Sequence, residues 1–323
     1  MKNIIKKVRN IALISLLIPA IGFGKELDKK VEDEVRIGYQ KYGTLILLKA
    51  SGELEKRLAP LGVKVTWSEF PAGPQLLEGL NVGGVDFGTT GETPPIFAQA
   101  ANAKIKYIGY EPPAPRGEAI VVQSNSSIKT VADLKGKKVV LNKGSNVHYL
   151  LVKALENAGL KYSDVETVFL APADARAAFE RGSVDAWVIW DPFLAAAETS
   201  IGAKVIQDGT NTVNNHQFYL AEENYASKRP DVVAAIFDEL KKVNDWAVTK
   251  PKEVANALAP LTGLDSITLE KALSRGGYGI NYLNEKVITE QQKIADTFYD
   301  LKLIPKKLDI KSVVWQPEQK INN

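Results

Sequence analysis

The sequence predicts an α/β protein of two similar lobes, each a mostly parallel sheet flanked by helices, with two hinge crossings between them as in a clamshell. Short apolar strand patterns alternate with helical patterns, and the same order then recurs further along the chain. A motif recurs with it, Gly-Gly-Val-Asp at 83–86 and Gly-Ser-Val-Asp at 182–185. One copy alone is a common turn between helix and strand, but two copies 99 residues apart, in matching runs, indicate an internal repeat.

The first run begins with an apolar strand at 35–39 and a helical spacing of apolar residues at 45–58. Alternation at 63–67 predicts a second strand, and a third is expected at 85–87. Helical patterns lie at 74–80 and at 94–101, where Pro94 occupies a first helical position. Because strands alternate with helices, we expect parallel pairing with helices on both faces.

The second run predicts strands at 138–141, 165–170 and 184–189, with helices at 147–158 and 174–181. Two short apolar runs, 119–122 and 218–221, are suited to crossing between the lobes. From residue 230 the pattern is helical, at 231–250, 251–258, 269–274 and 290–301, and we expect this part to return to the first lobe. The predicted lobes are therefore 35–120 plus 221–317, and 121–220, with a tail at 318–323.

The first 24 residues are typical of a secretory signal peptide. Four basic residues precede an apolar run at 11–21, which is too short to span a bilayer comfortably, and Gly-Phe-Gly at 22–24 provides small residues before a cut ahead of Lys25. An uncleaved amphipathic anchor is the alternative, but the charges cluster at one end. A charged linker at 25–34 follows. We expect a periplasmic protein from which this leader is removed.

Composition excludes several classes of protein. The 323 residues, about two domains in length, are 45% hydrophobic and 24% charged, unlike a disordered or polytopic membrane chain. Loss of the leader would leave 37 basic and 38 acidic residues, a net charge of −1 that provides no field for binding nucleic acid. The absence of cysteine excludes disulfides and thiol chemistry, and two histidines leave little for a metal site. We expect a monomer without cofactor or metal.

Four loops follow predicted strands and lead into predicted helices, at 40–44, 88–94, 143–148 and 190–192. Ligands of open parallel sheets bind at such positions, and the free N–H groups of helix N-termini favour an oxyanion. Ordinary helix capping explains any one loop, but a shared ligand better explains four that face one cleft. The candidate ligand-binding residues are Gln40, Thr44, Thr89, Thr90, Gly91, Glu92, Gly144, Ser145, Asn146, His148, Trp190, Asp191 and Arg275.

Four of these candidates have alternative roles. Glu92 and Asp191 are acids where an anion is expected, so they either cap helices or hold a cationic or hydroxyl part of the ligand. Arg275 lies in a glycine-rich turn at 274–279, and its planar guanidinium suits a headgroup with three oxygens, unless it is an ordinary surface arginine. Trp190 either forms an apolar wall of the pocket or belongs to the core.

Motifs of catalysis are weak in this chain. Ser145 and His148 are spaced to share a helix face, but no G-x-S-x-G motif surrounds the serine. Neither dinucleotide-binding nor P-loop motifs are present. A secreted serine hydrolase that uses Ser145 and His148 is therefore the alternative from another class of function.

Several segments resemble the aliphatic sulfonate-binding periplasmic proteins of ABC importers. The most specific are Phe-Pro-Ala-Gly-Pro-Gln at 70–75 and Trp-Asp-Pro at 190–192. Further similarity lies at 37–41, 94–100, 130–136, 172–179, 184–187 and 315–317. The resemblance therefore extends over 36–317, nearly the whole chain after the leader.

The resemblance implies a type II periplasmic-binding fold that is not an enzyme. It further implies that an alkanesulfonate binds between the lobes and passes to a membrane permease for sulfur acquisition. Matching positions place Gln40, Thr89, Thr90, Gly144, Ser145, Trp190 and Arg275 at or near the ligand.

The chain also departs from the family pattern. It has Gly-Thr-Thr-Gly-Glu at 88–92, where the family usually has Gly-Ser-Thr-Gly-Asp. Asn-Val at 146–147 replaces small hydroxyl residues, and Tyr42 adds bulk to the first loop. These differences leave ligand size and identity open. Taurine and a thiamine-precursor pyrimidine are therefore alternatives.

Overall fold

The computed structural model describes residues 33–41 and 43–316. The predicted leader, residues 25–32 of the linker, Tyr42 and the tail at 318–323 lie outside the described residues. None of the helices in the described ranges is long and apolar enough to cross a membrane.

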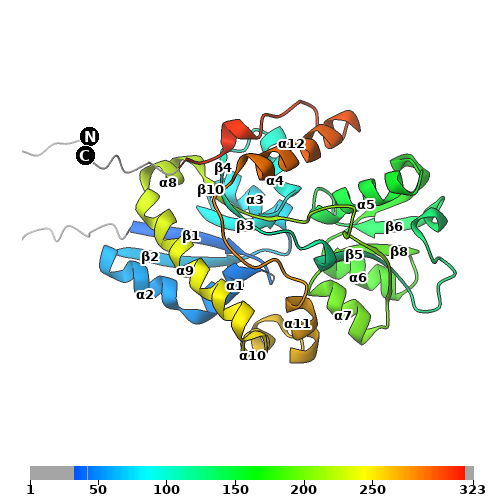
Figure 1. The fold of residues 1–323 in the computed structure, drawn as a ribbon, viewed down its shortest axis with the longest axis horizontal. Helices are drawn as coiled ribbons and strands as arrows, with labels where there is room; N and C mark the ends of the chain where they lie inside the picture. The colour runs from blue at the N-terminus through cyan, green and yellow to red at the C-terminus, as the bar shows by residue number, and fades with distance from the viewer. Residues whose placement is uncertain (1–32, 42, 317–323) are drawn as a thin grey trace, which may run out of the picture. The chain divides into compact units, whose positions relative to one another are not determined.

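The first sheet has five strands in the order β2-β1-β3-β10-β4 (Figure 1). Strands β1, β2 and β3 are parallel, whereas β10 is antiparallel to both β3 and β4. The strands span Asp33–Tyr39 (β1), Val63–Glu69 (β2), Phe87–Gly91 (β3), Ile105–Glu111 (β4) and Gln217–Glu222 (β10).

The second sheet repeats this arrangement in the order β7-β6-β8-β5-β9. Its parallel strands β6, β7 and β8 correspond to β1, β2 and β3, and its antiparallel strand β5 corresponds to β10. The strands span Glu118–Val122 (β5), Lys138–Leu141 (β6), Glu166–Phe169 (β7), Ala186–Trp190 (β8) and Lys204–Asp208 (β9). Two mostly parallel sheets of the same topology agree with the predicted fold class.

The two segments expected to cross between the lobes are instead strands within the sheets. Residues 119–122 belong to β5 and residues 218–221 belong to β10, and each is hydrogen-bonded to strands on both sides. They are apolar because both strands are buried. The chain passes from one sheet to the other at 112–117 and returns at 209–216. The sequence pattern also missed β4 and β9. The lobe boundaries given above stay a prediction.

Helices cover both faces of each sheet (Figure 1). The predicted helix at 45–58 is interrupted at Gly52, whose φ of 64° separates two helices. The last long helix begins at Glu285 rather than residue 290, because the Asn284 side chain accepts a hydrogen bond from the Val287 N–H. The helices are Thr44–Ser51 (α1), Glu53–Leu58 (α2), Gly73–Asn81 (α3), Pro94–Ala100 (α4), Asn146–Asn157 (α5), Pro172–Glu180 (α6), Phe193–Ser200 (α7), Glu223–Lys228 (α8), Pro230–Thr249 (α9), Pro251–Thr262 (α10), Ser266–Leu273 (α11) and Glu285–Asp300 (α12).

The repeated Gly-x-Val-Asp motif plays the same structural role in both sheets. The aspartates accept a backbone hydrogen bond at the first parallel strand of each sheet, Asp86 from the Arg36 N–H and Asp185 from the Lys138 N–H, both at 2.8 Å. The glycines at 83 and 182 both have left-handed φ values, 74° and 70°. The sequence repeat is therefore a structural repeat.

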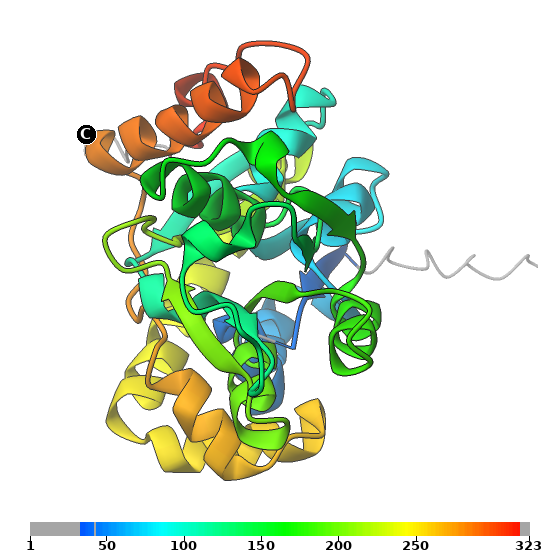
Figure 2. The same cartoon turned by 90° about the vertical axis from the view of Figure 1, so that its right-hand side faces the viewer.

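The C-terminal helices contact the second-sheet half on two sides. Phe298 of α12 packs against Phe97 of α4 and Tyr149 of α5. On the other side, Thr268 of α11 hydrogen-bonds with Thr199 of α7 (2.9 Å). Figure 2 shows α12 and the α10–α11 pair at opposite ends of the view.

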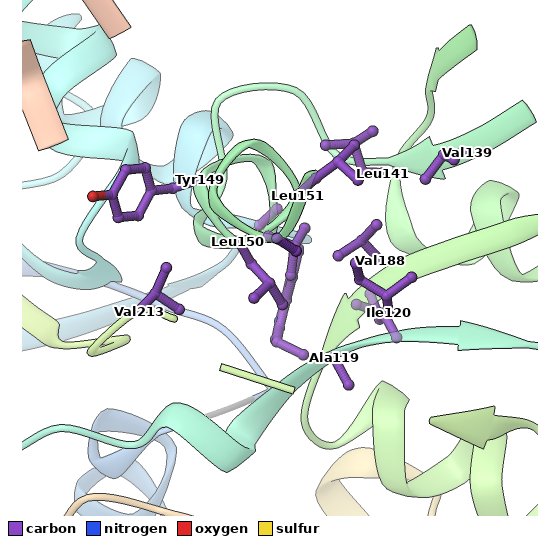
Figure 3. Packing of buried hydrophobic residues seen from close by; sticks show 14 of the residues in the cluster. Ala119, Ile120, Val139, Leu141, Tyr149, Leu150, Leu151, Val188 and Val213 are labelled. Atoms are coloured by element: carbon purple, nitrogen blue, oxygen red, sulfur yellow. The ribbon is translucent and has the colours of Figure 1, made fainter. Parts of the chain in front are cut away.

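The core of the second-sheet half lies beneath α5. Figure 3 shows Leu150 and Leu151 of this helix beside Ala119, Ile120 and Val188 of the sheet, all nearly inaccessible to solvent. Burial of these apolar side chains fixes α5 on the sheet, and with it the position of the preceding loop at 143–146.

Candidate functional site

One small cavity is lined by residues from all four predicted loops. Its lining residues are Gln40, Gly73, Gly91, Pro94, Ser145, Asn146, Trp190 and Gln217. We call this space the four-loop cavity. Its volume is about 20 Å³, room for about one water. A sulfonate headgroup therefore requires the surrounding side chains, or the two halves of the molecule, to separate.

The walls of the four-loop cavity come from strand ends and helix starts. Gln40 directly follows β1 and is held by a hydrogen bond from its Nε2 to the Thr89 carbonyl oxygen (3.1 Å). Ser145 is the N-cap residue of α5, and its Oγ donates to the Asn142 carbonyl oxygen (2.7 Å). Trp190 ends β8 and is 9% exposed. This is the arrangement that ligand sites of open α/β sheets share.

Asn146 closes the cavity from the second-sheet side. A Cβ added at Gly91 would lie only 1.8 Å from Asn146 Oδ1, so the amide rests directly on this glycine. Asn146 Nδ2 donates to Asn215 Oδ1 (2.5 Å), and Asn215 Nδ2 donates to the Ala114 carbonyl oxygen (2.9 Å). Asn146 is thereby bound directly to one of the segments that connect the sheets, and through Asn215 to the other.

Gly73 and Gln217 line the cavity but were not among the predicted residues. A Cβ at Gly73 would lie 2.8 Å from Pro94 Cγ, so only glycine fits there without a shift. Gly73 belongs to the Phe-Pro-Ala-Gly-Pro-Gln segment that carries the family resemblance, and this was the available signal. Gln217 begins β10, a strand that sequence reasoning treated as a crossing.

Several predicted residues lie outside the lining of the cavity. The hydroxyl of Thr89 donates to the Phe218 carbonyl oxygen (3.2 Å), and that of Thr90 donates to the Gly91 carbonyl oxygen (3.0 Å). The N–H of Gly144 donates to His148 Nδ1 (3.2 Å). The side chains of Thr89 and Thr90 and the N–H of Gly144 are therefore engaged with other groups of the protein.

Thr44 contacts a buried carboxyl instead of the four-loop cavity. Its Oγ1 donates to Glu111 Oε1 (2.7 Å) and also contacts the Tyr219 hydroxyl, which donates to the same oxygen (2.5 Å). Burial raises the pKa of Glu111 to about 7, although these two hydrogen bonds oppose the shift.

Ser145 and His148 do not hydrogen-bond to each other. The His148 Nδ1 accepts from Gly144, and its Nε2 lies 2.7 Å from the Tyr162 hydroxyl. The ring packs against Phe97 and Phe298. Burial lowers the pKa of His148 to about 4, so the imidazole is neutral at pH 7. Among the residues that the structure describes, no base is positioned to activate the serine.

Glu92 faces a different and larger cavity, of about 500 Å³, that also includes His216 and Glu290. Its Oε2 accepts a hydrogen bond from the His216 N–H (2.9 Å). Burial raises the pKa of Glu92 to about 7. This carboxyl therefore does not line the four-loop cavity.

Arg275 is bound by two carboxylates. Its Nε lies 2.9 Å from Asp191 Oδ2, and its Nη1 lies 2.8 Å from Glu198 Oε2. Asp191 also accepts from the Ala195 N–H (3.0 Å), which fixes it at the start of α7. The guanidinium thus connects the turn after α11 to the second-sheet half, and it does not line the four-loop cavity.

The described lining of the four-loop cavity carries no formal charge. Amide and hydroxyl side chains and the Trp190 indole are its polar groups, and the cavity lies beside the start of α5. Such fixed dipoles can stabilise a small anion without a charged partner. Among the described residues, no group of three or more side chains is placed to bind a metal ion.

Comparisons with known proteins identify the family of the chain. Residues 60–254 match the family model described as NMT1/THI5 like. A relative from Escherichia coli (strain K12), whose name describes it as an aliphatic sulfonates-binding protein, is 44% identical over 99% of this chain and 98% of its own. The chain belongs to the aliphatic sulfonate-binding protein family.

Two solved structures of this family have the same fold. The alkanesulfonate-binding protein SsuA from Xanthomonas axonopodis pv. citri, bound to MOPS, is 39% identical, with a TM-score of 0.83 over 87% of this chain and 98% of its own. The periplasmic aliphatic sulphonate binding protein SsuA from Escherichia coli is 45% identical, with a TM-score of 0.80 over 90% and 94%. The prediction of a type II periplasmic-binding fold is confirmed.

Proposed function

We propose that this protein is the periplasmic substrate-binding component of an ABC transporter, and that it binds aliphatic sulfonates and delivers them to the permease for sulfur acquisition. One observation carries the proposal: residues of both halves converge on a cavity lined only by uncharged groups, beside the start of α5. Such a lining suits an anion without a charged partner. Family membership supports export, a sulfonate ligand and a role without catalysis.

The role of Ser145 also favours binding over hydrolysis. Its hydroxyl donates to a backbone oxygen at 2.7 Å, and both nitrogens of His148 have other partners. The oxygen of Ser145 can still accept, or redirect its proton toward, a ligand in the cavity. We propose that Gln40, Gly91, Asn146 and Trp190, the other predicted residues that line the cavity, contact the ligand as well.

The first experiment is a calorimetric titration of residues 25–323 with ethanesulfonate, butanesulfonate, taurine, sulfate and nitrate. We expect one sulfonate per chain, recovered intact by mass spectrometry, with a Kd well below about 1 mM. Failure of every sulfonate to bind would contradict the proposal, and tighter binding of taurine than of ethanesulfonate would make taurine the ligand.

A serine substitution separates binding from hydrolysis. Ser145→Ala should weaken sulfonate binding by roughly tenfold, because one polar contact is lost, and no turnover should be detected in either form. Ser227→Ala, on the exposed surface of α8, is the matched control and should bind as the parent does. Turnover of an ester that disappears in Ser145→Ala would instead favour a hydrolase.

A further inference from the structure

Asn215 lies between the four-loop cavity and the two segments that connect the sheets. It is 1% exposed, and its φ of 53° is in the left-handed region. The two connecting segments are bonded to each other beside it, because the Ala114 N–H donates to the Asn214 carbonyl oxygen (3.0 Å). On the other side of Asn215, the His216 N–H donates to Glu92 Oε2 (2.9 Å). The backbone is therefore held on both sides of Asn215.

The hydrogen bonds of Asn215 allow its side chain one orientation. Its Nδ2 donates to the Ala114 carbonyl oxygen (2.9 Å), and a carbonyl oxygen can only accept a hydrogen bond. The other end of the amide, Oδ1, therefore faces Asn146 and accepts from Asn146 Nδ2 (2.5 Å). An oxygen of Asn146 at this position would meet another acceptor. Asn215 thus also determines which way round the Asn146 amide lies.

The Asn146 amide packs face-on against Gly91 at the wall of the four-loop cavity. A Cβ added at Gly91 would lie almost equally close to the oxygen, the nitrogen and the carbon of this amide, at 1.8, 1.9 and 2.1 Å. Nδ2 carries two N–H groups, and among the described residues its only hydrogen bond is the one to Asn215. The second N–H is therefore available to a ligand in the cavity that Asn146 lines.

We propose that Asn215 is a positioning residue of the sulfonate site, which holds the Asn146 amide so that Nδ2, and not Oδ1, is presented to the ligand. The inference rests on the function proposed above and adds to it a residue that does not line the cavity. The oxygens of an ionised sulfonate only accept hydrogen bonds, so an N–H of Asn146 attracts them and Oδ1 would repel them. Without Asn215 the amide can turn, and part of its contribution to binding is lost.

The test is a double-mutant cycle, measured by calorimetric titration with whichever of ethanesulfonate, butanesulfonate and taurine binds the parent most tightly. Asn215→Gly removes the amide and keeps the left-handed backbone, which glycine adopts without strain. We expect it to weaken binding roughly fivefold in the parent, and Asn146→Ala to weaken binding roughly tenfold. Added to Asn146→Ala, Asn215→Gly should cost less than about twofold more, because no amide is left to orient. Equal losses in both backgrounds would overturn the inference.

Asn211→Gly is the matched control for this cycle. Asn211 belongs to the same connecting segment and has a similar φ of 58°, but it is exposed and lines a different cavity. We expect this variant to bind the sulfonate within about twofold of the parent. A loss as large as that in Asn215→Gly would mean that the stiffness of the segment matters and the Asn215 amide does not, which would overturn the inference.

A second measurement does not depend on whether Asn215→Gly folds. In a nuclear magnetic resonance spectrum of the 15N-labelled parent, the side-chain amide signals of Asn146 are identified by their loss in Asn146→Ala. Saturation with the same sulfonate should shift one Nδ2 proton of Asn146 more than the other, which stays bonded to Asn215, and the Asn211 amide should not shift. If neither Asn146 proton shifts although the sulfonate binds, this inference is wrong and the proposed function stands. If no sulfonate binds the parent, the proposed function itself fails.

Discussion

Arg275 forms ion pairs with residues that lie far from it in the sequence. Its guanidinium is bonded to Asp191, 84 residues earlier, and also contacts Glu198. Asp191 is 1% exposed at its side chain, and burial raises its pKa to about 7 although Arg275 opposes the shift. Removing one member of a buried ion pair leaves an uncompensated charge, which costs more than the pair contributes.

Arg275→Met should therefore destabilise the protein by about 3–5 kcal/mol at pH 8. The loss should shrink at pH 5, because Asp191 then binds a proton and no longer needs a partner. Urea unfolding at both pH values measures this difference.

Arg176→Met provides the control for that measurement. Arg176 pairs with Glu180 on the surface of α6, and its loss should cost no more than about 1 kcal/mol at either pH. Equal effects of the two substitutions, or a loss in Arg275→Met that does not depend on pH, would show that the buried pair does not act as described.

Sequence reasoning located the loops of the site better than it located individual side-chain contacts. Gln40, Gly91, Ser145, Asn146 and Trp190 line the cavity because strand ends and helix starts must converge at one edge of each sheet. Several of the predicted residues that do not line the cavity point toward bonding partners that are distant in sequence. Thr44, for example, bonds a carboxyl 67 residues away, and no local pattern indicates such a contact.

At the scale of elements, the two copies of Gly-x-Val-Asp differ in the contacts and the burial of their aspartates. Asp185 accepts only the Lys138 N–H among the described residues. Asp86 accepts the Arg36 N–H and also binds the Arg36 guanidinium, with Nε at 2.9 Å from Oδ2. Asp86 is also the more buried of the two. The aspartate of the motif therefore makes more polar contacts in the first sheet than in the second.

We expect Asp185→Ala to lower the free energy of unfolding by about 1 kcal/mol and Asp86→Ala by about 2 kcal/mol. The difference arises from the guanidinium contact, which contributes only about 1 kcal/mol because the Arg36 side chain is 41% exposed and solvent screens its charge. Urea unfolding gives both values, and Arg36→Met separates the backbone contact from the ionic one. A larger loss in Asp185→Ala would contradict this account.

Most parallel strands and helices were predictable because their signals are local. The apolar runs at 35–39 and 138–141 fall within β1 and β6. Strand β10 was recognised as an extended segment but placed wrongly, since its neighbours β3 and β4 precede it by more than 100 residues. Pairing over such distances depends on the completed sheet, which a local pattern does not encode.

At the scale of the whole molecule, buried ionisable groups set the pH dependence of stability. Burial raises the pKa of Glu92, Glu111 and Asp191 to about 7, well above their ordinary values of 4.5, 4.5 and 3.8. Between those values the folded protein holds protons that the unfolded chain has lost, so stability falls as pH rises through 7. His148, with its pKa lowered to about 4, acts in the opposite direction below pH 6.5.

Burial also raises the pKa of Glu118 well above 4.5, so four carboxyls act against one imidazole, and the protein should be more stable at pH 5.5 than at pH 8 by at least about 2 kcal/mol. Urea midpoints across this range test the expectation. Glu92→Gln should flatten the profile, since the amide does not titrate. Stability that rises steadily from pH 5.5 to 8 would mean that these carboxyls are ionised in the folded protein.

The insertion of β10 between β3 and β4 also dictates an order of assembly (Figure 1). All five strands of the second sheet come from a continuous stretch, 118–208, whereas the first sheet stays open until residues 217–222 arrive. As the chain emerges during synthesis or export, its earliest strands must wait for a late one, while the middle of the chain can already be complete. The half that is made first is thus the last to be finished.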